Sequence, residues 1–416
     1  MKKFLAFFTL FILSLCLVAC GGKKEEGHTI NLIYSGTSSD QAFNEKLFED
    51  FKAARKAAGD PNTYVIKYIA HGPDKVDSEI LDWQSSNAPD VYEAASDKIA
   101  ILYSKGALAK LPSAYANYID EEMSEMGKAL ATLNGEYYNY PYTGDNTYYL
   151  QYDKKVFSEE DVKSIESLLA KANELGVKVG YELETAFWGG AAMFTFGADY
   201  QLTYDLDGNL IKTVADFDSD KGLKAAKAIY KIMKDPAWIN TSGVPSADSE
   251  TKAVIAGTWS VQAYKELLGD DYGCAVMPTV TVDGETKHLG CFLGGKFFGV
   301  NPQRSAGDSE RLQAAHELAK FLSGAACQTK RYEEASIYPC NVNAQNHPAM
   351  ASDPNVLVLK AQSEFAHVQS AVPDTFWNAP SNLTAGIKDG TYTEANLQEA
   401  INNFNTAVKG TTGADE

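Results

Sequence analysis

Three tryptophans, Trp188, Trp259 and Trp377, stand beside turn-forming residues, where an indole ring can face an opening. A flat aromatic ring packs against the apolar C–H face of a pyranose, and nearby carboxylates or amides can bind the hydroxyl groups. The alternative for each ring is packing in a core, and we assign Trp83 to a core because it follows an amphipathic pattern. The three tryptophans therefore predict stacking chemistry, with rings from both halves of the molecule sandwiching a carbohydrate.

Motifs for nucleotide or hydrolytic chemistry are incomplete. Residues 290–296 have the glycine and lysine spacing of a phosphate loop, but Phe297 stands where a Ser or Thr hydroxyl is required. His316-Glu317 begins like a zinc-protease helix, but Lys320 stands where the second histidine is needed. We therefore expect a binding protein, not an enzyme, with no cofactor and no metal. A glycosidase that uses two acidic residues is the alternative.

The formal net charge of −18 restricts the class of partner. Phosphates of nucleic acid or of an anionic lipid surface would be repelled, so we expect no nucleic acid partner. A neutral or cationic solute fits this charge, and a polyamine or metal receptor stays an alternative to a sugar receptor.

The N-terminus has the layout of a secretory signal, because two lysines precede an apolar run over residues 4–18. That run, about 15 residues, is shorter than a membrane-spanning helix needs. Leu17-Val18-Ala19-Cys20 resembles the bacterial lipobox, which implies cleavage after residue 19 and lipid attachment at Cys20. We expect a signal peptide at 1–19, a tether at 20–28 and a lipid-anchored location on the outer face of the cytoplasmic membrane; an ordinary cleaved signal is the alternative.

Strand-like and helix-like periodicities alternate along the mature chain, which predicts a wound, parallel α/β sheet. Strands are expected near 29–34, 64–69 and 89–92, and helices near 43–54, 78–85, 158–175, 219–234 and 248–256. Asp207-Gly208 and Asp283-Gly284 lie between β-rich runs and predict tight hairpin turns.

About 400 residues remain after residue 19, which is too long for one ordinary core and predicts two lobes. No Pro- or Gly-rich linker separates them, so we expect the chain to cross between lobes several times, near 142–147, 290–296 and 339–344. Several parallel crossings allow a hinge to bend. The four remaining cysteines, Cys274, Cys291, Cys327 and Cys340, allow up to two disulfides or none.

Short motifs in a fixed order extend over nearly all of the mature chain. They are Asp90 with Asp97-Lys98, Gly106-Ala107-Leu108, Asn134-Gly135, Tyr140-Pro141, Gly257-Thr258-Trp259, Met277-Pro278, residues 295–301, residues 317–321 and Phe376-Trp377. In this order the chain resembles the maltose- and maltodextrin-binding proteins of bacterial ABC importers, the group 1 extracellular solute-binding proteins.

The resemblance implies a two-lobed periplasmic-binding-protein fold of type II with the ligand cleft between the lobes. It implies lobe 1 at 29–142 and 296–340, lobe 2 at 143–292 and 344–410, and a disordered tail at 411–416. It also implies a monomer that captures malto-oligosaccharides by closing its lobes and delivers them to ABC permease subunits in the membrane. The sugar-binding residues that it implies are Asp97, Lys98, Asp145, Glu184, Phe187, Trp188, Trp259 and Trp377.

Two departures from the pattern bear on the ligand. Ala94 stands where maltose-binding proteins commonly carry a tryptophan, and the loop at 35–40 lacks their polar contacts. A different oligosaccharide therefore stays an alternative to malto-oligosaccharides.

Overall fold

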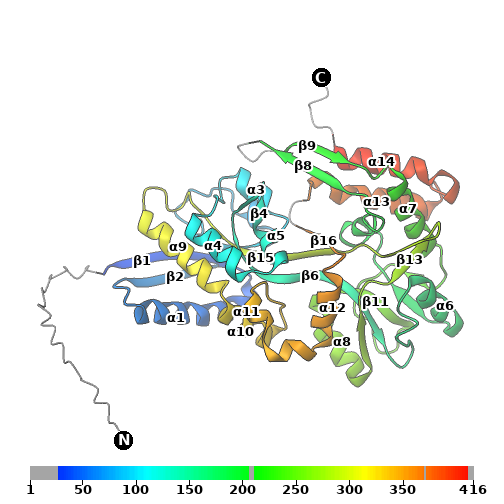
Figure 1. Cartoon of the computed structure of the whole chain (residues 1–416), viewed down its shortest axis with the longest axis horizontal. Coiled ribbons are helices and arrows are strands. Elements are labelled where there is room, and N and C mark those ends of the chain that lie inside the picture. The colour runs from blue at the N-terminus through cyan, green and yellow to red at the C-terminus, as the bar shows by residue number, and fades with distance from the viewer. Residues whose placement is uncertain (1–26, 206–209, 370–371, 411–416) are drawn as a thin grey trace, which may run out of the picture.

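Two lobes lie side by side and are joined by two long strands, β6 (Tyr140–Asp153) and β15 (Phe292–Val300), that run from one lobe into the other (Figure 1). The structure is a computed structural model, and it describes residues 27–205, 210–369 and 372–410. The signal peptide at 1–19, Cys20, most of the tether and the tail at 411–416 lie outside the described residues. No described helix is long and apolar enough to cross a membrane.

Lobe 1 is built as strand and helix alternate along the chain. Its first elements are β1 (Thr29–Gly36), α1 (Gln41–Ala57), β2 (Thr63–Ala70), α2 (Val76–Glu79), β3 (Val91–Ala95) and α3 (Ile99–Ser104). The strands lie in the order β15-β3-β1-β2, with β1 parallel to both of its neighbours. Because β1 buries alternate residues, α1 can pack Leu47, Phe48 and Phe51 against that face. The expected parallel winding is confirmed for β1, β2 and β3, whereas β15 runs antiparallel to β3, so the sheet is mixed.

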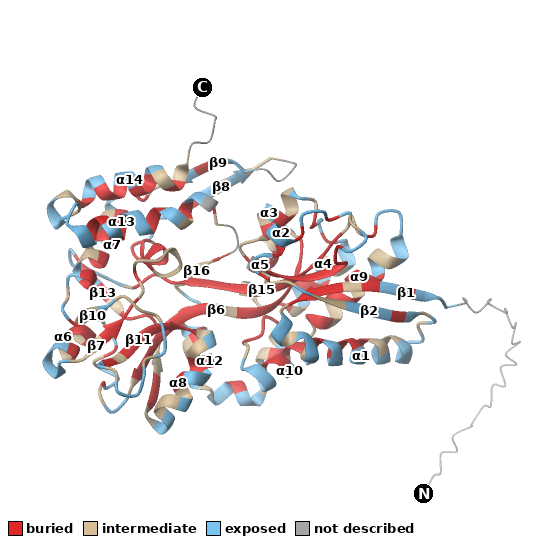
Figure 2. Cartoon of the chain, turned by 180° about the vertical axis from the view of Figure 1, so that it is seen from behind, coloured by how far each residue is buried: buried red, intermediate tan, exposed pale blue. Residues whose placement is uncertain are grey.

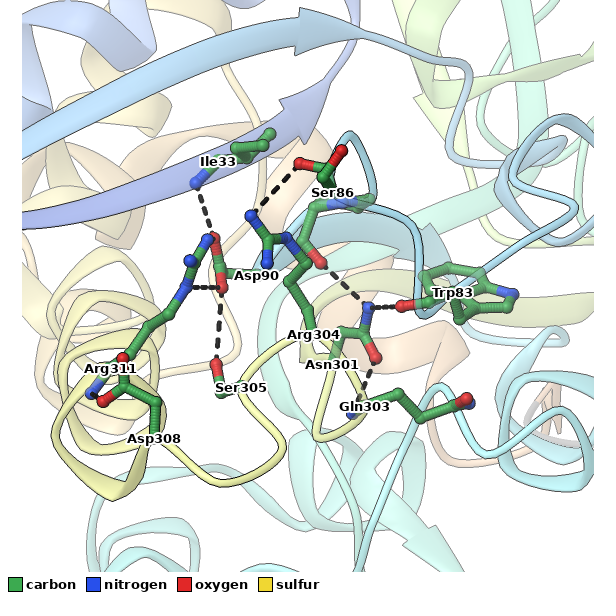
Figure 3. Close-up of polar contacts among 11 residues, drawn as sticks. Ile33, Trp83, Ser86, Asp90, Asn301, Gln303, Arg304, Ser305, Asp308 and Arg311 are labelled. Carbon is green, nitrogen blue, oxygen red and sulfur yellow. Dashed lines mark hydrogen bonds and ion pairs between the residues drawn. The ribbon is translucent and has the colours of Figure 1, made fainter.

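A buried ion pair fixes the edge of lobe 1 that lies away from the lobe junction. Asp90, which is fully buried, accepts hydrogen bonds from the Arg311 guanidinium at 2.7 and 2.8 Å and from the Ile33 backbone N–H at 2.7 Å (Figure 3). Arg311 comes from α9 (Ser309–Leu322), which follows β15. The pair therefore joins the early and late segments of lobe 1.

Lobe 2 holds the strand order β10-β7-β11-β6. Its elements include α6 (Ile165–Leu175), β7 (Lys178–Gly180), α7 (Asp220–Met233), β10 (Trp238–Ile239), β11 (Thr251–Gly257), α8 (Val261–Leu268), β12 (Tyr272–Ala275), α13 (Ala379–Asp389) and α14 (Leu397–Lys409). Residues 248–256, expected as a helix, form mostly strand β11, so that prediction is wrong. The run from Ala253 to Ala256 is fully buried between β6 and β7, and a short apolar run of this kind has no period that separates strand from helix.

The hairpin predictions have different outcomes. Asp283 (φ 50°) and Gly284 (φ 82°) form the turn between β13 (Thr279–Val282) and β14 (Glu285–His288), as their sequence predicts. Strands β8 (Tyr200–Tyr204) and β9 (Leu210–Ala215) pair antiparallel as expected. The turn at Asp207-Gly208 lies outside the described residues.

A third connection links the lobes next to the crossing strands. After α10 (Ala325–Ala335), Cys340 and Asn341 remain hydrogen-bonded to lobe 1, because Ser124 N–H donates to the Cys340 carbonyl and Asn341 donates to Glu122. Beyond α11 (Val342–Gln345), helix α12 (Pro354–Gln362) contacts lobe 2. The chain therefore passes to lobe 2 directly after the segment in which the crossing was expected.

Burial concentrates on the strands and on the helix faces that cover them (Figure 2). Separate apolar clusters fill lobe 1 and lobe 2, and a smaller cluster lies around β6, α8 and α12. Trp83 belongs to a lobe 1 cluster, as predicted. Cys274, Cys291, Cys327 and Cys340 are all free thiols, so none of the possible disulfides forms among them.

Candidate functional site

A cavity of about 420 Å³ lies between the lobes. The crossing strands contribute Asp145 and Lys296, lobe 2 contributes residues 258–265 at the start of α8, and lobe 1 contributes residues 332–338 at the end of α10. Because each lobe supplies a wall, the width of this cavity depends on how the lobes sit relative to one another.

Asp145 lies at the centre of the first crossing and is half-buried. Its carboxylate accepts a hydrogen bond from the Tyr338 backbone N–H at 2.9 Å, and its backbone carbonyl accepts one from the Thr258 hydroxyl at 2.5 Å. Burial raises the pKa of the Asp145 carboxyl, and the Tyr338 N–H and the positive charge of Lys296 oppose that rise. The carboxylate is thus held in place at the cavity wall.

Trp259 presents the most exposed aromatic ring of the predicted set. It follows β11 and lines the cavity, and 60% of its surface is accessible. The ring centroids of Phe187 and Trp188 lie 6.2 and 6.3 Å from it. Both come from a π-helical turn, Ala186–Gly190, which follows β7. The Trp259 indole packs against Phe187 and Trp188 and is still largely exposed, so it can stack against a sugar ring.

The other two tryptophans are half-buried on the core of lobe 2. Trp188 stacks on Tyr148 at 5.5 Å, and Trp377 lies 5.8 Å from Phe292. Phe187 also lies 5.8 Å from Phe292, so the aromatic residues form one continuous group. All of the predicted tryptophans therefore come from lobe 2, and the expectation of indole rings from both halves is wrong. The implied bounds of lobe 2, 143–292 and 344–410, already contained all three tryptophans, so they conflicted with that expectation.

Asp97 and Lys98 come from lobe 1, between β3 and α3. Lys98 forms an ion pair with Asp77 at 3.4 Å. Burial raises the pKa of the Asp97 carboxyl, and the adjacent Lys98 partly offsets this. Neither Asp97 nor Lys98 lines the cavity that holds Asp145 and Trp259.

The Glu184 carboxylate forms an ion pair with another residue of lobe 2. Both of its carboxylate oxygens accept from the Lys388 ammonium at 2.9 Å, and its backbone N–H donates to Asn240. Lys388 lies on α13, so this ion pair fastens the loop after β7 to that helix. Glu184 is close in sequence to Phe187 and Trp188, but its carboxylate is already paired with Lys388.

Sequence reasoning missed two contributors to the cavity. Tyr338 acts through its backbone N–H, which no residue pattern reveals. Lys296 was included in a failed phosphate loop, an expected crossing and a family motif but not among the sugar-binding residues, and the structure places it on β15 beside Asp145. Ala94 is fully buried, so no side chain replaces the tryptophan that the family pattern carries there.

The chemistry of this site suits a neutral, hydroxyl-rich ligand. The cavity combines an exposed indole with a carboxylate, an ammonium and the polar groups of Thr143 and Asn146. Among the described residues, no group of three or more His, Cys, Asp or Glu side chains is arranged to hold a metal ion. His316 and Glu317 are used elsewhere, because His316 contacts Tyr140 and Glu317 contacts Arg55.

Comparisons with known proteins agree with this architecture. The family model for the bacterial extracellular solute-binding protein matches residues 46–358. A maltooligosaccharide ABC transporter solute-binding lipoprotein of Streptococcus pneumoniae (strain ATCC BAA-255 / R6) is 26% identical, over 94% of this chain and 94% of the relative. A galactooligosaccharide-binding protein of Bacillus subtilis (strain 168) is 23% identical, over 98% of this chain and 97% of the relative.

A solved structure shares the fold. The maltodextrin binding protein MalE1 from L. casei BL23, solved without ligand, superposes with a TM-score of 0.77 at 20% identity, over 92% of this chain and 99% of that one. The predicted two-lobed fold of type II is therefore confirmed. Because the family model matches more than half of the sequence, this chain belongs to the bacterial extracellular solute-binding proteins.

Proposed function

We propose that this protein captures malto-oligosaccharides in the cavity between its lobes and delivers them to the permease of an ABC importer. One observation carries the proposal: Trp259, with 60% of its surface accessible, lines the same interlobe cavity as the half-buried carboxylate of Asp145. A pyranose needs both an apolar platform and charged hydrogen-bonding groups, and this cavity provides them together.

The relatives support a sugar as the ligand and leave its linkage to experiment. The Streptococcus relative is named for maltooligosaccharides and the Bacillus relative for galactooligosaccharides, at similar identity. Ala94 stands where the family commonly carries a tryptophan, so one expected stacking ring is missing. A galacto-oligosaccharide therefore stays the second candidate ligand.

Lobe closure is part of the proposal. The lobes are taken as 29–142 with 296–340 and 143–292 with 344–410, and the separate apolar clusters support treating each as a rigid unit. Three neighbouring connections can bend together, which would narrow the cavity around the ligand. The ligand would then stabilise the closed form by its contacts with both walls.

The proposal also includes a lipid anchor at Cys20 and no catalytic activity. Cleavage before Cys20 and lipid on its thiol would hold the protein on the outer face of the cytoplasmic membrane. The family membership supports binding without chemistry. Incubation with maltoheptaose should therefore release no new reducing ends, and release of shorter sugars would favour the glycosidase alternative.

A thermal-shift screen tests the ligand class. Maltotriose should raise the Tm in a concentration-dependent manner, because a ligand that binds only the folded state stabilises it. Galactobiose, xylotriose and spermidine serve as the competing chemistries. A shift with galactobiose alone would select the second candidate, and a shift with spermidine alone would overturn a sugar receptor of any kind.

A further inference from the structure

Lys296 lies on a strand that is paired on both sides at the lobe junction. On β15 it pairs with Ala95 of β3 on one side and with Thr143 of β6 on the other, and its N–H donates to the Thr143 hydroxyl at 3.0 Å. The register with β6 is irregular on both sides of Lys296. Such irregularities redirect a side chain and occur often beside functional sites. The backbone pairing therefore fixes the position from which the Lys296 side chain extends.

The ammonium of Lys296 has no hydrogen-bond or ion-pair partner in the described part of the chain. The side chain is half-buried and lines the cavity with Asp145 and Trp259. Lys98 at the junction differs, because it is paired with Asp77. A partly desolvated cation without an acceptor is unfavourable, so this position is ready for a ligand that brings one.

The charges of Lys296 and Asp145 act on one another across this cavity. Lys296 lowers the pKa of the Asp145 carboxyl against the upward effect of burial. The cavity lining carries charges of both signs, because Glu334 and Asp353 lie there with Asp145, and Lys265 lies there with Lys296. A neutral polyol can satisfy both Lys296 and Asp145, because each hydroxyl can donate and accept.

We propose that Lys296 is a sugar-binding residue: its ammonium donates to one hydroxyl of a pyranose that lies against Trp259, while a neighbouring hydroxyl of that unit donates to Asp145. The inference rests on the proposed function and deepens it, because it names the donor and the acceptor that hold one unit of the sugar. Lys296 lies on a crossing strand, so it would hold this sugar unit at the hinge itself.

Calorimetric titration with maltotriose tests this inference. Lys296→Met should weaken affinity about tenfold or more, as expected for a hydrogen bond from a charged donor. Lys296→Arg should retain part of the affinity because it keeps a charged donor. Lys360→Met, on the exposed surface of α12, is the matched control and should bind as the parent protein does.

The pH profile separates the effect of Lys296 on Asp145 from a direct contact with the sugar. Without Lys296 the pKa of Asp145 rises, so affinity should decline at a higher pH in Lys296→Met than in the parent. A loss of affinity that persists at high pH, where Asp145 is ionised in both proteins, reports the lost contact between the Lys296 ammonium and the sugar. If Lys296→Met does not fold, Lys296→Gln removes the same charge and should show the same displacement. Parent-like affinity and profile in a folded variant would overturn the role of Lys296 alone, whereas no binding of any sugar by the parent would overturn the proposed function as well.

Discussion

The Asp145 carboxylate accepts the backbone N–H of Tyr338 at 2.9 Å and so ties the first crossing strand to the segment that leaves α10. Gly144 N–H also donates to the Tyr338 carbonyl at 3.0 Å, so the two chain segments are linked on both sides. Asp145 therefore serves two purposes at the junction, since it is a candidate ligand contact and it holds the wall of the cavity.

The two purposes of Asp145 can be separated by substitution. Asp145→Asn keeps an acceptor for the Tyr338 N–H but removes the charge, so sugar affinity should fall about tenfold while the Tm stays nearly constant. Asp145→Ala should lower both, because it also leaves the buried Tyr338 N–H without its acceptor. Calorimetry and thermal unfolding measure the two effects. Equal affinity in Asp145→Asn and the parent would show that the carboxylate does not contact the ligand.

Arg311 is expected to be the most sensitive charged residue of lobe 1. Arg311→Met would leave the fully buried Asp90 carboxylate without its bidentate partner and should lower the free energy of unfolding by roughly 3–5 kcal/mol. Urea unfolding measures this change. Arg304→Met is the matched control, because Arg304 donates only to the exposed Ser86 carbonyl, and it should change stability by less than about 1 kcal/mol. A similar loss in both variants would contradict a special role for the buried pair.

His316 should make the protein less stable in mild acid. Burial lowers the pKa of His316 to about 4, below the value of about 6.5 in an unfolded chain. The unfolded state then binds more protons between these values, so stability is full above about pH 6.5 and falls as the pH drops toward 4, by up to roughly 3 kcal/mol. Urea unfolding across this range should show a smaller decline in His316→Phe. Parallel declines in the two proteins would rule out His316 as the cause.

Local chemistry made several features predictable. The turn at Asp283-Gly284 follows from the positive φ angles that a tight hairpin requires. The alternation in β1 and the apolar face of α1 predicted their packing because both patterns are periodic. The prediction of a helix at 248–256 was wrong because a fully buried strand does not alternate apolar and polar residues.

The sequence could predict the types of residue in the candidate site but not which distant segments of the chain meet there. Trp259 and Asp145 were found from their motifs, and the structure brings them to one cavity. The pairing of Glu184 with Lys388 and the contribution of Lys296 depend on segments far apart in the chain. That the three tryptophans share lobe 2 follows from the implied lobe bounds, which the expectation of rings from both halves did not take into account. Their roles in sugar binding stay predictions.

Calorimetric titration of Trp259→Ala with the sugar that gives the largest thermal shift is the most direct test. Loss of the exposed indole should weaken binding tenfold or more, since a stacked aromatic ring contributes about 1–3 kcal/mol, while the Tm without ligand stays unchanged. Leu175→Ala, which removes an exposed apolar side chain at the end of α6, should leave affinity unchanged. If Trp259→Ala bound the sugar as tightly as the parent, the ligand would not lie on this ring and the account of the site would be wrong.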